Sequence, residues 1–112
     1  MEIVNANRLA TIQRREIAQK VSQITQRLEY KSAEQTTADV QNIIEHGFMF
    51  VAMKEDRPFL ITILEPSGQN GITYIKGVYN LATTENEMDE LLSVMLDHYR
   101  TRYCTPGDSF VI

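Results

Sequence analysis

The sequence contains a single cysteine, Cys104, among its 112 residues. One cysteine cannot form an internal disulfide or complete a four-ligand zinc site. No apolar run approaches the roughly 18 residues of a membrane span. The opening residues, MEIVNANRLA, lack the long apolar core of a signal peptide. We therefore expect a cytoplasmic protein with no membrane partner.

Hydrophobic residues make up 43% of the chain and charged residues 23%, which is typical of a folded domain and not of a disordered chain. The length fits one domain covering residues 1–112. The formal net charge is −4, but it is unevenly spread: residues 1–31 hold six basic and three acidic side chains, and residues 32–112 hold five basic and twelve acidic ones. Such asymmetry either marks a basic binding surface or reflects a solvated helix face.

The pattern predicts one long helix over residues 5–30, with Asn5 as its N-cap. No glycine or proline interrupts this segment, and apolar residues recur along it at Leu9, Ile12, Ile17, Val21, Ile24 and Leu28. The last four follow the spacing by which helices pack along a seam. A continuous helix of about 26 residues would be about 39 Å long, which is as long as a compact domain of this size is wide.

Two further helices are expected. One spans residues 37–46 and ends at Gly47, with Ser32 and Gln35 at capping-box spacing as an alternative start. The other is an amphipathic helix over residues 84–103, which begins with a capping box formed by Thr84 and Glu87. Its apolar face consists of Met88, Leu91, Leu92, Met95, Leu96, Tyr99 and Tyr103.

Three strand-like runs lie between these helices, over residues 48–54, 59–65 and 72–80. Short turns at 55–58 and 66–71 join them, so we expect a three-stranded antiparallel meander over residues 48–80. The tail, residues 104–112, ends in an apolar segment that either adds a short edge strand or docks on the sheet. The predicted class is α+β, with two N-terminal helices, the meander and a C-terminal helix.

Both faces of the predicted sheet are apolar, because apolar residues occupy both sets of alternating positions in its first two strands. We expect helix 84–103 to cover one face and either the N-terminal helices or a second copy to cover the other. So much apolar surface favours a homodimer. The candidate partner-binding residues are Ile17, Val21, Ile24 and Leu28 of the seam, with Tyr74 and Tyr79, which strict alternation places on opposite faces of the third strand.

The residues that would support catalysis are few. His46 and His98 are the only imidazole bases, and Cys104 lies about 240° around a helix from His98. The residues three and four positions before each histidine carry no metal ligand. The glycines of the 66–71 turn precede a strand, whereas a phosphate-binding loop leads into a helix. We therefore predict no catalytic residue, no metal site and no cofactor.

The sequence thus favours a non-enzymatic protein–protein interaction module that acts as a homodimer and binds an unidentified protein. Its role would be that of a small acidic adaptor, a chaperone, or an inhibitor or modulator carried by a mobile element. The alternative is a nucleic-acid-binding regulator that uses the basic N-terminal helix through Arg8, Arg14, Arg15 and Arg27. On a continuous helix Arg8 and Arg15 would lie within about 20° of each other.

Overall fold

The computed structural model describes residues 2–29, 33–67, 71–103 and 109–111, and it leaves the side chains of residues 26–36 undescribed. The elements in chain order are β1 (Glu2–Asn5), the 3-10 helix η1 (Ala6–Arg8), α1 (Thr11–Glu29), α2 (Ala33–Glu45), β2 (Met49–Lys54), β3 (Arg57–Pro66), β4 (Ile72–Asn80), α3 (Glu85–Tyr103) and β5 (Ser109–Val111). The predicted α+β class is confirmed, but the sheet has five strands where the sequence predicted three with an optional fourth.

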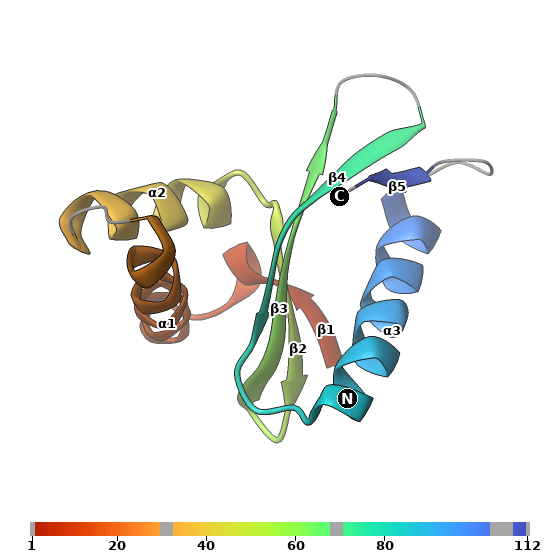
Figure 1. The fold of residues 1–112 in the computed structure, drawn as a ribbon, viewed down its shortest axis with the longest axis horizontal. Coiled ribbons are helices and arrows are strands. Elements are labelled where there is room, and N and C mark those ends of the chain that lie inside the picture. The colour runs from red at the N-terminus through yellow and green to blue at the C-terminus, as the bar shows by residue number, and fades with distance from the viewer. Residues whose placement is uncertain (1, 30–32, 68–70, 104–108, 112) are drawn as a thin grey trace.

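The strands lie in the order β1-β2-β3-β4-β5 (Figure 1). β1 to β4 pair antiparallel, and β5 adds to β4 in parallel, which is the first of the two alternatives for the tail, a short edge strand. Between β2 and β3 the turn is shorter than expected, because Arg57 and Pro58 already belong to β3. Its two residues, Glu55 and Asp56, have φ angles of 52° and 61°. Two positive φ angles match the twist of a tight hairpin.

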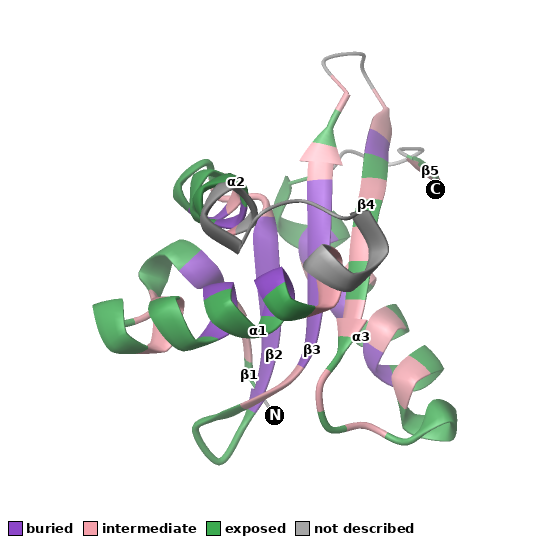
Figure 2. Cartoon of the chain, turned by 60° about the vertical axis from the view of Figure 1, so that its left-hand side comes forward, coloured by how far each residue is buried: buried purple, intermediate pink, exposed green. Residues whose placement is uncertain are grey.

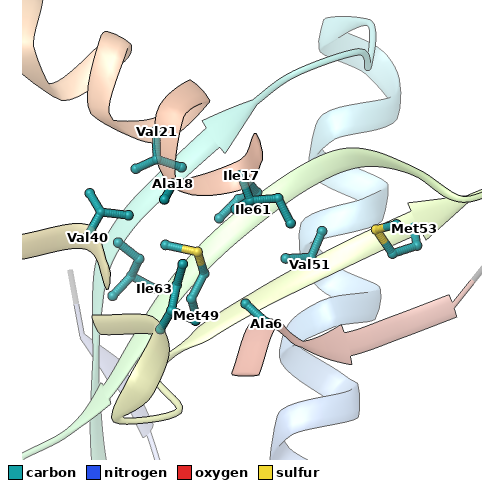
Figure 3. Close-up of a cluster of buried hydrophobic side chains, with 11 residues drawn as sticks. Ala6, Ile17, Ala18, Val21, Val40, Met49, Val51, Met53, Ile61 and Ile63 are labelled. Carbon is teal, nitrogen blue, oxygen red and sulfur yellow. The ribbon is translucent and has the colours of Figure 1, made fainter. Parts of the chain in front are cut away.

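Each face of the sheet is covered by helices of the same chain. In Figure 1, α1 and α2 lie on one side of the strands and α3 lies on the other. The α1/α2 side holds a core cluster that includes Ile17, Val21 and Ile61 (Figure 3). On the α3 side, Leu60 and Met95 belong to a second cluster. The two-sided apolar pattern of the strands therefore reflects two internal layers.

This arrangement corrects the reasoning behind the predicted homodimer. We expected the apolar sheet to need cover from a second subunit, with the N-terminal helices as the alternative. In the structure the N-terminal helices cover this face, since Ile17 and Val21 are only 1% and 0% exposed and pack against the sheet of their own chain. Dimerisation stays a prediction, but the faces of β2 and β3 no longer support it, because these strands are largely buried (Figure 2).

The predicted helix over residues 5–30 is wrong at its start. Residues 2–5 form β1, which pairs with β2 in the register Glu2 with Met53 through Asn5 with Phe50. Asn5 does act as a cap, but for η1, since its side chain accepts a hydrogen bond from the Asn7 amide. The 19 residues of α1 span about 28 Å at 1.5 Å per residue, less than the 39 Å longest extent of the molecule. Ile12, a predicted member of the buried stripe, is 71% exposed.

The other two helices follow their local signals more closely. α2 begins at Ala33, earlier than residue 37, and the chain turns at Gly47 with a φ of 80°. The capping box of α3 is confirmed, because the Glu87 amide donates to Thr84 Oγ1 over 3.3 Å. The buried face of α3 is also confirmed at Leu91, Met95 and Tyr99, but Tyr103, the last predicted member, is 57% exposed.

A bulge in β4 overturns the prediction that Tyr74 and Tyr79 lie on opposite faces. Gly77 pairs with Ile63 and Ile75 pairs with Leu64, so one residue of β4, Lys76, has no counterpart on β3. Tyr79 is opposite Ile61 and Tyr74 is opposite Glu65. Ile61 and Glu65 are four positions apart on one strand and share a face. Both tyrosines therefore lie on the α1/α2 face.

Candidate protein-binding edge

β1 forms one edge of the sheet. Within the described part of the chain it is hydrogen-bonded to β2 alone and stands at one end of the strand order. An edge strand directs every second backbone N–H and C=O group away from its neighbour, and these groups can pair with a further strand. The four residues Glu2–Asn5 thus present a short row of backbone donors and acceptors.

A cleft of about 850 Å³ runs along this edge. β1 forms part of its lining. On the α1/α2 side the cleft is lined by Arg8, Leu9 and Gln13, and on the α3 side by His98, Arg102 and Tyr103. Figure 2 shows α1 crossing the strands, with its exposed first turn on the β1 side. A volume of this size falls within the range of about 300–1,000 Å³ that is usual for ligand clefts.

The two walls of the cleft continue the two layers of the molecule. Ile3 packs against the core cluster on the α3 side, whereas Val4 packs against the cluster on the α1/α2 side. Successive residues of a strand placed beside β1 would point to the same two sides in turn. One set of side chains would reach Arg8 and Gln13, and the alternate set would reach Arg102 and Tyr103.

The charges in the cleft separate along β1. Arg8 is three residues after Asn5, the last residue of β1, and therefore lies near the Asn5 end of the cleft. Arg102 lines the cleft from the last turn of α3, and the ring of its neighbour Tyr103 lies 5.9 Å from the ring of Phe50, the partner of Asn5. This end is basic.

The Glu2 end of the cleft is acidic. Glu2 pairs with Met53, and the turn residues Glu55 and Asp56 follow closely in the chain. Lys54 lies here too, with its ammonium group 5.6 Å from the centre of the Phe59 ring. Among the residues that line the cleft here, three carboxylates and one ammonium give a negative balance.

His98 stands in the α3 wall, one helical turn before Arg102. Burial lowers the pKa of the His98 imidazole below its ordinary value, and the positive charge of Arg102 lowers it further. His98 is therefore neutral near pH 7, and the charge of the basic end comes from the two arginines.

The predicted partner-binding residues do not form this edge. Ile17 and Val21 are buried in the core cluster of the α1/α2 side. Ile24 is half-buried on α1, and the side chain of Leu28 lies outside the description. Tyr79 packs against the same core, whereas Tyr74 is 37% exposed with the Lys76 ammonium 5.1 Å from its ring centre. The β1 edge was therefore not predicted from the sequence. The only local signal for this strand is the pair of β-branched residues Ile3 and Val4.

The basic residues of the alternative function lie in different places. Arg8 belongs to η1 and lines the β1 cleft, so the helical spacing that joined it to Arg15 does not apply. Arg14 and Arg15 lie on α1 and line a shallow hollow together with Glu45 of α2. The side chain of Arg27 is outside the description, as is the whole of Cys104.

No group of three or more His, Cys, Asp or Glu side chains in the described residues is placed to hold a metal ion. Among the described helices, none combines the length and the apolar character needed to cross a membrane. The chain matches no protein family model, no curated protein and no solved structure in the comparisons with known proteins.

Proposed function

We propose that this chain is a protein–protein interaction module that binds an extended segment of another polypeptide along β1. The observation that carries the proposal is the coincidence of an edge strand with a cleft whose walls come from both helical layers. In this mode of recognition, main-chain hydrogen bonds supply affinity, and the pockets on either side of the added strand supply specificity. The role as an adaptor, chaperone or modulator in the cytoplasm belongs to the same proposal.

Two side chains of α3 that line the cleft supply the contacts that would anchor a segment. Tyr103 is 57% exposed and stacks edge-on toward Phe50, and aromatic residues are enriched at the centres of protein interfaces. Arg102 is exposed beside it. A segment in the cleft would cover both side chains.

The test uses the full chain to select binders from a displayed library of random peptides. We expect the enriched peptides to lose at least about tenfold in affinity for the Tyr103→Ala variant, since a central aromatic anchor is worth that much or more. Val94→Ala is the matched control, because Val94 is 49% exposed on the same helix and does not line the cleft.

An absence of enriched peptides would contradict the proposal. So would peptides that bind the Tyr103→Ala variant as tightly as the wild type. The homodimer is tested separately by light scattering of the chain without peptide. A mass of one chain at all concentrations would remove the dimer from the account and leave peptide binding in place.

A further inference from the structure

We infer that the segment bound at β1 runs antiparallel to it and carries acidic residues in its N-terminal part and basic residues in its C-terminal part. This inference rests on the proposed function and specifies the chemistry of the partner. Its basis is the separation of charge along the cleft, with Arg8 and Arg102 at the Asn5 end and Glu2, Glu55 and Asp56 at the other.

The direction follows from strand pairing. An antiparallel ladder is slightly more stable per residue than a parallel one. In that direction, the N-terminal part of the added segment lies beside Asn5 and its C-terminal part lies beside Glu2. Carboxylates therefore belong at its start, near Arg8 and Arg102, and cationic side chains belong at its end.

The alternation of the added strand sets the spacing of these charges. Arg8 stands on the α1/α2 side of the cleft and Arg102 on the α3 side. Because neighbouring side chains of a strand point to opposite faces, two consecutive acidic residues reach the two arginines at once. A single acidic residue would reach one wall alone.

The middle of the segment faces an apolar environment. Ile3 and Val4 are half-buried, and each packs against a different core cluster. Residues opposite them would therefore be β-branched or otherwise apolar, since cross-strand pairs of that kind stabilise a sheet.

Two synthetic peptides of identical composition test the inference. One is Asp-Glu-Val-Thr-Val-Lys-Arg and the other is Lys-Arg-Val-Thr-Val-Asp-Glu, both acetylated and amidated so that the termini carry no charge. We expect the wild-type chain to bind the first about five- to tenfold more tightly at low salt, because several exposed ion pairs of modest strength add together. The preference should disappear near 0.5 M salt, where the Debye length is only about 4 Å.

A charge-swapped variant provides the matched comparison. It combines Arg8→Glu and Arg102→Glu with Glu2→Lys and Glu55→Lys, all at exposed positions. We expect this variant to prefer the second peptide. Because the salt dependence is measured on the wild-type chain, the test holds even where the variant is unstable.

Equal binding of the two peptides to the wild-type chain would overturn the inference and leave the proposed function in place. Binding of neither peptide would overturn it as well. The proposed function would fall with it only if the library selection were also empty or its peptides bound the Tyr103→Ala variant as tightly as the wild type. A chain that pairs with itself through β1 and is not displaced by either peptide would show that the occupant is a second copy, which also contradicts the inference.

Discussion

Paired substitutions on β3 test whether both faces of the sheet are sealed by the chain's own helices. Ile61 and Leu60 are neighbours, both 0% exposed, and they belong to the α1/α2 cluster and the α3 cluster respectively. Replacing either by alanine removes three carbon groups from a packed environment. At about 0.8 kcal/mol per buried group, the folded state loses about 2.4 kcal/mol of favourable transfer free energy. The cavity left behind raises the total to about 3–4 kcal/mol.

The assay is equilibrium denaturation of Ile61→Ala and Leu60→Ala, with Ile12→Ala as the exposed control. A domain of about 100 residues loses about 4 °C of melting temperature per kcal/mol, so each core variant should melt about 12–16 °C below the wild type. The control should stay within about 0.5 kcal/mol of it. The packing of α1 and α2 on the sheet would be refuted if Ile61→Ala lowered the free energy of unfolding by less than about 1 kcal/mol while Leu60→Ala lowered it by the expected amount of about 3–4 kcal/mol.

Three further variants test individual features of the structure by equilibrium unfolding. Thr62 is 0% exposed and its hydroxyl has no hydrogen-bond partner among the described residues. Thr62→Val should therefore raise the free energy of unfolding by about 1 kcal/mol. A lower free energy of unfolding in this variant would show that the hydroxyl does have a hydrogen-bond partner. The double variant Glu55→Asn with Asp56→Gly supplies the residues that tolerate positive φ angles and should stabilise the hairpin by about 1 kcal/mol, and an unchanged midpoint would contradict the turn geometry. Because the pKa of His98 is lower in the folded chain than the ordinary value of 6.5, the unfolded chain takes up a proton first as the pH falls. Stability should therefore decline below about pH 6.5 in the wild type and decline less in His98→Gln, and equal declines in the two proteins would refute the shift.

The features predicted correctly from the sequence are those with strong local signals. The capping box at Thr84 and Glu87 sets the start of α3, and Gly47 ends the second helix. The strands β2 to β4 were found because runs of apolar and β-branched residues alternate with turn residues. These signals act over a few residues and need no knowledge of the rest of the chain.

The features that were missed depend on distant contacts. β1 has only four residues, and it is a strand because β2, nearly fifty residues later, offers it an edge. The bulge at Lys76, which brings Tyr74 and Tyr79 to one face, arises from the register between β3 and β4. The cleft combines β1, η1, the β2–β3 turn and the end of α3, so no local pattern could reveal it.

Amide hydrogen exchange along β1 shows whether a polypeptide segment pairs with this edge of the sheet. The outward-facing amides of Glu2–Asn5 should exchange rapidly in the chain alone, because an edge strand leaves them without a partner strand. With a saturating selected peptide we expect every second amide of β1 to be protected at least about tenfold, while the amides bonded to β2 change little. Protection that appears at β5 or on the helices, with β1 unchanged, would contradict binding at this edge.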